Sequence, residues 1–569
     1  MSGRTRFSAE VEGGALRDLV TGERVALAPG QEGAEGAIVL AREGAVLATL
    51  AAPGTALGDL YRLAGGAGLD VAFGDEVMDE VQAIERARPV EDPALVDRTA
   101  IPFVTVDGPG ARDLDQALHV EARPGGWTVR YALADAAHYV PRDGALFAEA
   151  LGRGASYYLP GLSVPMLPRA LSEGLVSLGP RVDRRALLFV MELDGAGHCT
   201  ATRIERARIR SRAQLTFDEV QGLLDAPGSS ALQGADFEPS LRAFREVGRA
   251  RLREAAERDV VRYRRREVGV ALDGATGFVV LEGLRREVEL WNEQISLLVN
   301  GEGARILREC SSPSIQPIYR VHPPPEPERI ESLRATVAAI AAAHRLDPAR
   351  WVWDEHTSLA LYLACLPVEG EHARVARAIQ RQAILVNVRS TYATEPAPHH
   401  GVGLEPYGRF SAPMREIVGV YLHGEAIELL EGREATGEEE LRARVVAAAN
   451  ASKDTQRRLG DLVNRRVLDR IFGPDLDRPR EARRRYAGTV MGIGQGKLHV
   501  QLDEPGIDVK VYLRDAGRVW RAFLVPDELG VTLRERGGRV RATVGDAITV
   551  RVLERDRERD RYVLEPVER

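Results

Sequence analysis

The sequence has few cysteines, almost no lysine and no long apolar run. Its three cysteines, Cys199, Cys310 and Cys365, lie far apart in 569 residues and form no Cys-x-x-Cys pair, which excludes a disulfide scaffold and a structural zinc site. No apolar stretch approaches the about 18 residues that a membrane-spanning helix needs. The first residues lead into polar sequence without the apolar core of a secretory signal. We therefore expect a cytoplasmic protein with no disulfide partner and no membrane association.

The basic side chains are almost all arginine. Lys453, Lys497 and Lys510 are the only lysines among 77 Lys and Arg residues, and 84 Asp and Glu residues give a formal net charge of -7. Codon bias in GC-rich DNA explains this composition. Phosphate binding, which suits the bidentate guanidinium group, is the functional alternative. The chain is not globally basic, so its charge does not by itself identify a nucleic-acid partner.

Hydrophobic patterning predicts a multidomain α+β protein with four segments. We expect residues 1–95 to form a small α/β module, either one altered barrel or a winged-helix-like unit. We expect residues 96–430 to form one large domain of mixed sheet and helices, of the size of a catalytic domain, and residues 431–484 to form a helical extension and linker. Residues 485–569 contain five short apolar or alternating runs between Gly, Asp and Pro, which is typical of a five-stranded OB-fold barrel.

Several elements can be placed within these segments. Residues 35–50 contain two apolar runs around Arg-Glu-Gly and predict a β-hairpin. Helical spacing of apolar residues predicts helices over 57–64, 74–84, 287–306 and 329–345.

The strongest local signal is an acidic turn that follows an apolar strand. In FVTVDGPGARDLD the strand ends at Asp107, Gly-Pro-Gly reverses the chain, and Asp113 and Asp115 follow two residues apart. That spacing points both side chains to one side of an extended segment, and the turn can return Asp107 to them. Carboxylates this close repel one another unless protons or a cation intervene, and Mg²⁺ suits such oxygen ligands. A solvated turn with scattered acids is the alternative.

The sequence around and beyond this turn resembles the ribonuclease II family of exoribonucleases, whose catalytic unit is the RNB domain. The resemblance covers roughly residues 100–425. It rests on the acidic turn and on LADAAHYV at 133–140, RGASYYLP at 153–160, VPMLP at 164–168, TEPAPHHGVGLE at 394–405 and SAPMR at 411–415. It implies a Mg²⁺-dependent enzyme that processively hydrolyses single-stranded RNA from its 3′ end to nucleoside 5′-monophosphates. Structured RNA is left open as a substrate.

The resemblance also implies which residues carry the reaction. Asp107, Asp113 and Asp115 would hold the metal, with Asp115 at the essential catalytic position. Arg415 would face the scissile phosphate and stabilise the charge that develops on it. The fourth acidic position of the family is Gln116 here, which retains a carbonyl oxygen as a metal ligand but lacks the charge.

Further residues are expected to bind the RNA. Tyr158 and Tyr263 match aromatics that stack on the 3′-terminal bases, and Glu293 and Glu395 match glutamates near the active centre. Tyr512 would contact RNA on the C-terminal barrel, which resembles the S-one type of RNA-binding OB domain. Each has a structural alternative, since tyrosines also fill cores and glutamates also form ion pairs.

Three departures from the family pattern favour a second hypothesis. Gln116, Gln294 and Gly419 stand where the family has acidic residues, so the alternative is a catalytically weakened RNA-binding protein that retains the channel. Residues 1–95 are too few to hold two cold-shock barrels comfortably, and the N-terminal module is therefore atypical. We expect a monomer that acts on RNA rather than DNA, because family members select 2′-hydroxyls.

Overall fold

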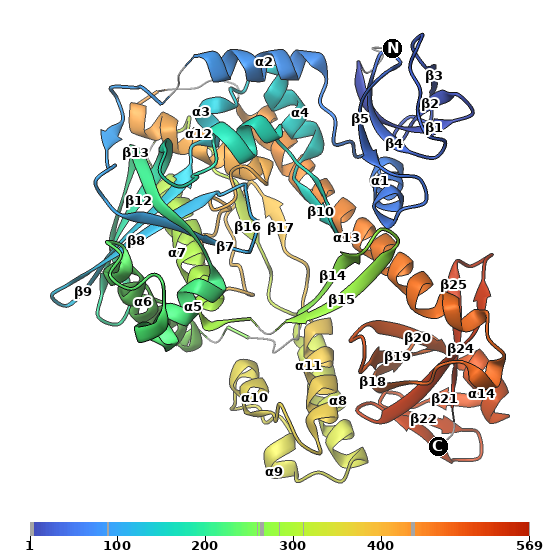
Figure 1. Ribbon diagram of the computed structural model, residues 1–569. Helices are drawn as coiled ribbons and strands as arrows, with labels where there is room; N and C mark the ends of the chain where they lie inside the picture. The colour runs from blue at the N-terminus through green and yellow to red at the C-terminus, as the bar shows by residue number, and fades with distance from the viewer. Residues whose placement is uncertain are drawn as a thin grey trace.

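The computed structural model describes residues 5–87, 90–258, 260–261, 267–283, 285–310, 312–433 and 438–567. Figure 1 shows a central domain with an N-terminal module beside it and a C-terminal barrel below, and one long helix runs between them. The sheets are mixed in the centre and antiparallel at both ends, which confirms the expected multidomain α+β organisation.

The N-terminal module is an antiparallel sheet of five strands, in the order β3-β2-β1-β4-β5, followed by helices. The elements are β1 (Arg6–Glu12), β2 (Ala15–Asp18), β3 (Arg24–Ala26), β4 (Ile38–Arg42), β5 (Ala45–Ala51), α1 (Ala56–Gly66) and α2 (Asp75–Arg86). The predicted hairpin and both predicted helices are present. Five strands form one antiparallel sheet before the first helix, which is not the arrangement of a winged helix.

The central domain is built on a sheet whose strand order closes on itself. The order is β12-β9-β8-β7-β13-β6, and β12 also pairs with β13. β13 closes the ring because it pairs with β12 over 199–210 and with β7 over 211–216. The strands are β6 (Val96–Asp97), β7 (Phe103–Asp107), β8 (Gln116–Arg123), β9 (Gly126–Ala134), β12 (Asp183–Asp194) and β13 (Cys199–Thr216). The turn from β7 to β8, which carries the acidic residues, therefore lies at one end of this sheet.

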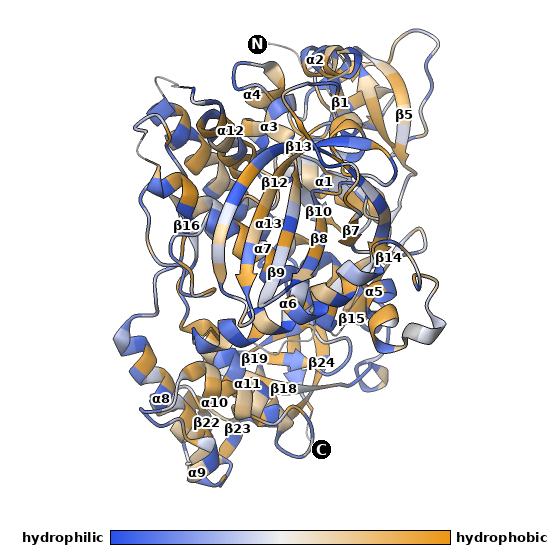
Figure 2. Ribbon diagram, turned by 90° about the vertical axis from the view of Figure 1, so that its left-hand side faces the viewer, coloured by the Kyte–Doolittle hydropathy of each residue, from blue (hydrophilic) through white to orange (hydrophobic). Residues whose placement is uncertain are grey.

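Helices cover this sheet and bury its apolar residues. Side chains from 129–134 and 186–191 form nearly continuous buried runs, as expected for strands covered on both faces. Figure 2 shows hydrophobic residues along the central strands. The helices are α3 (Ala136–Tyr139), α4 (Ala145–Arg153), α5 (Phe217–Asp225), α6 (Glu238–Glu257), α7 (Glu287–Glu309) and α12 (Ile417–Glu431). Short elements are β10 (Tyr157–Leu159), β11 (Leu162–Val164), a π-helix (Ala170–Leu175), a 3-10 turn (Pro227–Ser229), β14 (Glu267–Asp273), β15 (Gly277–Gly283), β16 (Tyr319–Val321) and β17 (Thr391–Ala393).

One helix, α13 (Glu438–Leu476), ties the domains together. It packs on α1 of the N-terminal module, on β10 and β17 of the central domain and on β24 (Ala547–Asp556) of the C-terminal barrel. Asn450 of α13 fixes β17, since its Oδ1 accepts the Tyr392 N–H at 2.9 Å and its Nδ2 donates to the Tyr392 carbonyl at 3.0 Å. Within the described residues, no helix is both long enough and apolar enough to cross a membrane.

A second core joins four helices of the central segment to the C-terminal barrel. Val337 and Ile379 belong to the same buried cluster as Val490 and Leu498 of the barrel. The helices are α8 (Pro327–Ala343), α9 (Pro348–Trp351), α10 (Leu359–Cys365) and α11 (Ala373–Leu385), and the barrel strands are β18 (Tyr486–Gly494), β19 (Lys497–Leu502), β20 (Asp508–Tyr512), β24 (Ala547–Asp556) and β25 (Arg561–Pro566). The five expected barrel strands are confirmed, and their order matches that of the N-terminal module.

An insertion between β20 and β24 was not expected. It consists of α14 (Leu513–Trp520) and a three-stranded sheet, β21 (Leu524–Pro526), β22 (Thr532–Glu535) and β23 (Val540–Thr543), and a 3-10 turn (Arg480–Ala482) precedes the barrel. These strands are short, and Phe523, Val525 and Val540 are exposed. The alternation by which a half-buried strand is recognised is therefore weak here.

We predict that Gly248→Ala destabilises the central domain. A Cβ on Gly248 of α6 would lie 2.2 Å from Cγ of Trp291 on α7, whose side chain is buried. Overpacking of this kind costs about 1–3 kcal/mol, so the midpoint of thermal unfolding should fall. The matched control is Gly222→Ala in α5, where a Cβ meets nothing within 4 Å. Calorimetry of both variants tests the prediction, and equal midpoints would contradict it.

Candidate active site

An ion pair between Asp115 and Arg415 joins the acidic turn to the start of α12. Asp115 Oδ2 accepts the Nε–H of Arg415 at 2.5 Å, and its Oδ1 accepts the backbone N–H of Met414 at 3.0 Å. The Asp115 side chain is only 1% exposed, whereas that of Arg415 is 35% exposed. Burial raises the pKa of Asp115 to about 6, although Arg415 and the Met414 N–H oppose that rise. Arg415 thus presents its outer face to solvent while a buried carboxylate anchors it.

The acidic turn is held by its own backbone. Gly110 adopts a φ of 79°, which a glycine accepts readily and which allows the reversal after β7. Ser177 Oγ donates to the Arg112 carbonyl at 2.6 Å and accepts the Leu114 N–H at 3.1 Å. These contacts fix the path from Asp107 to Asp115.

The loop that carries Arg415 is held by a buried asparagine of α7. Asn300 Oδ1 accepts the N–H groups of Phe410 and Ser411 at 2.7 and 3.0 Å. Its Nδ2 donates to the Ser411 Oγ at 3.0 Å. His423 of α12 supports the same loop, since its Nε2 lies 2.9 Å from the Phe410 carbonyl oxygen. Sequence analysis did not identify Asn300, although a polar residue on the apolar face of a predicted helix was an available signal.

Asp107, Asp113 and Tyr158 lie around Arg415. Asp107 accepts the Gly108 N–H at 2.7 Å, and Asp113 Oδ2 accepts the Tyr158 hydroxyl at 2.8 Å. Burial raises the pKa of Asp107, the charge of Asp113 adds to the rise, and Arg415 opposes it. The charges of Asp115, Asp113 and Asp107 all favour the protonated form of Arg415, so the three predicted aspartates act on one guanidinium group, although their oxygens do not all lie within 4.8 Å of one another. The Tyr158 ring is exposed, as a base-stacking residue must be.

Gln116 is engaged inside the protein and does not offer a free ligand atom. Its Nε2 donates to the Ser411 carbonyl, and its Oε1 accepts the Tyr131 hydroxyl. The Ser296 hydroxyl lies 3.4 Å from the same oxygen. An amide oxygen has two lone pairs, and both face hydroxyl groups here. The expected ligand Gln116 therefore supports the Arg415 loop in this structure.

The other predicted RNA-binding residues have different surroundings. Glu293 pairs with Arg285 at 2.6 Å, and Glu395 is exposed beyond β17. The Tyr512 ring lies near two cations, with Arg561 Cζ 3.8 Å and Lys497 Nζ 5.6 Å from its centroid. Tyr263 lies outside the described residues.

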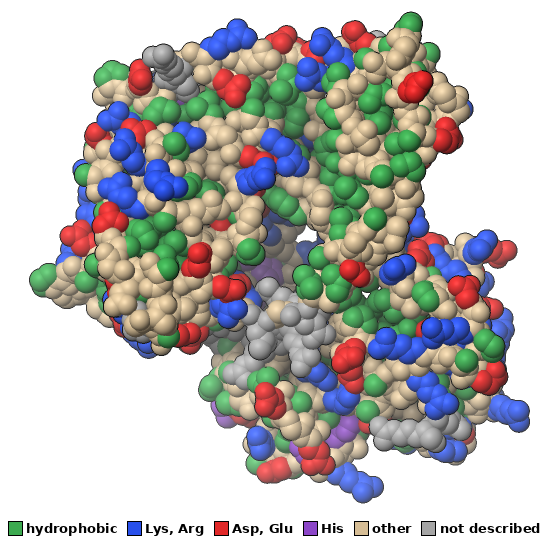
Figure 3. Space-filling view, viewed as in Figure 1, with side chains coloured by type: hydrophobic (Ala, Val, Ile, Leu, Met, Phe, Trp, Pro, Cys, Tyr) green, Lys and Arg blue, Asp and Glu red, His purple; other side chains and the backbone are tan. Residues whose placement is uncertain are grey.

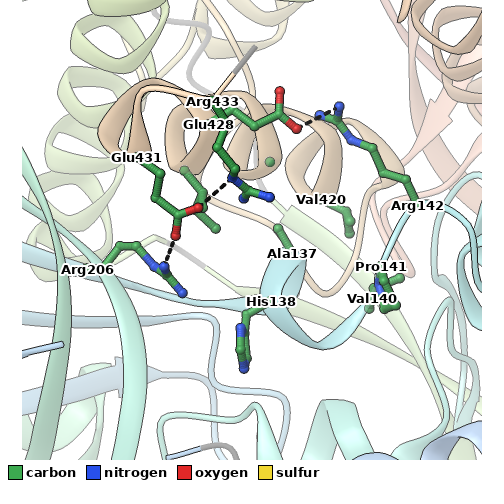
Figure 4. Close-up of a pocket in the computed structure, with 12 residues that line it drawn as sticks. Ala137, His138, Val140, Pro141, Arg142, Arg206, Val420, Glu428, Glu431 and Arg433 are labelled. Carbon is green, nitrogen blue, oxygen red and sulfur yellow. Dashed lines mark hydrogen bonds and ion pairs between the residues drawn. The ribbon is translucent and has the colours of Figure 1, made fainter. Parts of the chain in front are cut away.

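A different acidic group lies between the later turns of α12 and the start of α13. Among the described residues, Glu425, Glu428 and Glu438 are the one set of three potential ligands whose oxygens all lie within 4.8 Å of one another. Arg142 pairs with all three and supplies their countercharge. A cavity of about 520 Å³ adjoins them, in which Glu431 bridges Arg206 and Arg433 (Figure 4). It contains none of the predicted site residues.

Figure 3 shows a hollow in the middle of the molecule, between the central domain and the C-terminal barrel, with Lys and Arg side chains above it. In Figure 1, β14, β15, β16, β17 and α13 surround the same region.

Comparisons with known proteins agree with this geometry. The model of the RNB domain matches residues 96–430, which include the acidic turn and Arg415. Ribonuclease R of Escherichia coli K12 is 26% identical over 492 residues, covering 84% of this chain and 58% of that protein. Exoribonuclease 2 of Edwardsiella piscicida is 30% identical over 417 residues, covering 73% of this chain and 61% of that protein. The chain thus spans less than two thirds of the length of either relative.

A solved structure has the same fold. Mycoplasma genitalium RNase R, in complex with ribose-methylated single-stranded RNA, superposes with a TM-score of 0.79 at 18% identity. The match covers 99% of this chain and 90% of that one. With the RNB model matching more than half of its residues, the chain belongs to the family defined by the RNB domain.

Proposed function

We propose that this chain is a Mg²⁺-dependent 3′→5′ exoribonuclease that processively shortens single-stranded RNA to nucleoside 5′-monophosphates, acting as a cytoplasmic monomer. The observation that carries the proposal is the grouping of Asp107, Asp113, Asp115 and Tyr158 around Arg415 within the RNB segment. The names of its relatives, Ribonuclease R and Exoribonuclease 2, support the same activity.

Arg415 has the geometry of a phosphate-binding residue. Asp115 engages its Nε, and in the described part of the chain no partner is found for its two terminal amino groups. A guanidinium held at one nitrogen presents the other two as a fork that fits two non-bridging phosphate oxygens. It would stabilise the negative charge that develops on the scissile phosphate during in-line displacement by water.

The acidic residues fit a divalent cation in their chemistry. Burial raises the pKa of Asp107, and the nearby charge of Asp113 raises it further. A bound cation would offset both effects, because it stabilises the ionised carboxylates. Asp107 and Asp113 would hold Mg²⁺ together with Asp115, and Gln116 is not in the set because its amide is engaged. When bound, the ion would activate water and neutralise charge on the phosphate.

The alternative, a catalytically weakened RNA-binding protein, also has a specific observation in its favour. The two oxygens of Asp115 accept hydrogen bonds from Met414 and Arg415, and the Gln116 amide donates to the Ser411 carbonyl. Such a chain would retain the stacking surface of Tyr158 and the cation of Arg415. It would bind RNA without shortening it.

We predict that the protein shortens 5′-labelled single-stranded RNA in Mg²⁺ by single nucleotides to a short limit product. EDTA should abolish the reaction. Asp115→Asn should also abolish it, because the neutral amide neither pairs with Arg415 as a charge nor retains the cation. A gel time course measures this. RNA that stays intact with the unsubstituted protein, yet shifts on a native gel, would support the alternative instead.

We predict that activity depends on the ionisation of Asp115. Because the pKa of Asp115 is raised to about 6, its charged form predominates above that pH and is lost below it. At a Mg²⁺ concentration well below saturation, the value of kcat/KM should therefore fall as the pH drops through about 6, approaching about tenfold per pH unit as for a single ionising group. RNA binding by Asp115→Asn should show no such inflection. A flat kcat/KM between pH 5 and pH 7, with the protein still folded, would refute this role.

We predict that Tyr158→Ala weakens RNA binding because base stacking is removed. An aromatic stack contributes about 1–3 kcal/mol per base, or about 5- to 150-fold in Kd. Tyr158→Phe is the matched control, since it retains the ring and removes only the hydrogen bond to Asp113. Fluorescence anisotropy with labelled RNA in the Asp115→Asn background gives both values. Equal weakening by the two variants would assign the effect to the hydroxyl group.

A further inference from the structure

A second group of cations lies beside Arg415, arranged around Glu416. This group, the Glu416 cluster, consists of Arg320 of β16, Arg409 and Glu416 in the loop before α12, and Lys453 on α13. Glu416 Oε1 accepts the Arg409 Nε–H at 3.2 Å, and Lys453 Nζ lies 3.3 Å from its Oε2. The cluster therefore joins the Arg415 loop to α13.

Tyr392 of β17 also contacts the Glu416 carboxylate. Its hydroxyl donates to Glu416 Oε2 at 2.5 Å. The Arg320 guanidinium is occupied by structural contacts, with its nitrogens 3.1–3.3 Å from the Ser390 Oγ and 3.3 Å from the Tyr392 hydroxyl. Arg320 is thus a positioning residue that orients Tyr392.

The cluster carries surplus positive charge. Burial alone would raise the pKa of Glu416, but Arg409, Lys453, Tyr392 and Arg320 lower it to about 2, so the carboxylate is ionised at neutral pH. One negative charge then faces the three cations Arg320, Arg409 and Lys453. Two positive charges remain uncompensated within the cluster, next to Arg415, and an anion bound there would relieve their repulsion.

Donors in the cluster remain open. For the residues that the structure describes, Arg409 has no partner on its two terminal amino groups, and Lys453 has Glu416 as its one ion-pair partner. The side chains of Arg409 and Lys453 are 30% and 26% exposed, which admits a ligand. Each side chain is anchored by one carboxylate and otherwise presents unused N–H groups, as Arg415 does on Asp115.

The two cation groups are close enough to act on one RNA strand. Glu416 follows Arg415 directly in the chain, and the positive charge of Arg415 acts to lower the pKa of Arg409. Successive phosphates of a strand are evenly spaced negative charges. A strand whose terminal phosphodiester binds Arg415 therefore has further phosphates within reach of the Glu416 cluster. An ammonium such as that of Lys453 binds phosphate as a compact point charge.

We propose that Arg409 and Lys453 form a second phosphate site, which binds an internucleotide phosphate upstream of the one held by Arg415. The inference rests on the proposed function, because it takes RNA as the ligand. It has a consequence for product size. RNA too short to place a phosphate at this site binds weakly, so the site contributes to the length at which shortening stops.

The test is the salt dependence of RNA binding. In the uncut Asp115→Asn background, the slope of log K against log salt for single-stranded RNA falls by about 0.7 for each phosphate that the protein no longer neutralises. We expect that decrease for Lys453→Gln and not for Lys453→Arg, which restores a cation. Arg305→Gln on α7 is the surface control, since Arg305 pairs with Glu302 and Glu309, and its slope should not change.

A second measurement uses the protein with Asp115 intact. Lys453→Gln and Arg409→Gln should stop at longer limit products than the unsubstituted protein, with calorimetry confirming that each variant folds. If Lys453→Gln leaves both slope and product length unchanged while RNA is still shortened, the second phosphate site is overturned and the proposed function stands. If no protein shortens RNA but the slope falls as expected, the site stands and the proposed function fails.

Discussion

The ion pair between Asp115 and Arg415 is the contact on which the candidate site depends. It joins two segments 300 residues apart, the turn after β7 and the start of α12. A carboxylate as buried as Asp115 would be costly without a cation and a hydrogen-bond donor, and Arg415 and the Met414 N–H supply both. Asn300 and Gln116 form hydrogen bonds to Ser411 of the same loop. Several hydrogen bonds therefore hold the Arg415 loop in place, whereas part of the Arg415 side chain is open to solvent.

α13 has two roles that its length makes possible. Through Asn450 it fixes β17, and through Lys453, three residues further along, it reaches Glu416. The same helix continues to the C-terminal barrel, which shares a core with α8 to α11. The outer domains are thus attached to the element that completes the cation groups around the site.

Much of the fold was predictable because it rests on local patterns. The hairpin over 35–50, the helix over 287–306 and the five strands of the C-terminal barrel follow from periodicity and turn residues, which neighbouring residues encode. The insertion with β21, β22 and β23 was missed because its strands are short and partly exposed. The N-terminal module was left between two alternatives, since length and composition do not distinguish strand orders.

The sequence by itself determined the candidates for the site: Asp107, Asp113, Asp115, Tyr158 and Arg415 stand in ordered motifs along the chain. Tertiary structure alone decided which of their atoms are already engaged. It turned the Gln116 amide toward Tyr131 and Ser411, placed Arg561 over the Tyr512 ring, and brought Arg409, Glu416 and Lys453 together from a loop and a distant helix. The physical reason is that residue identity and spacing are local, whereas the partner that satisfies a buried charge or amide comes from wherever the chain folds back.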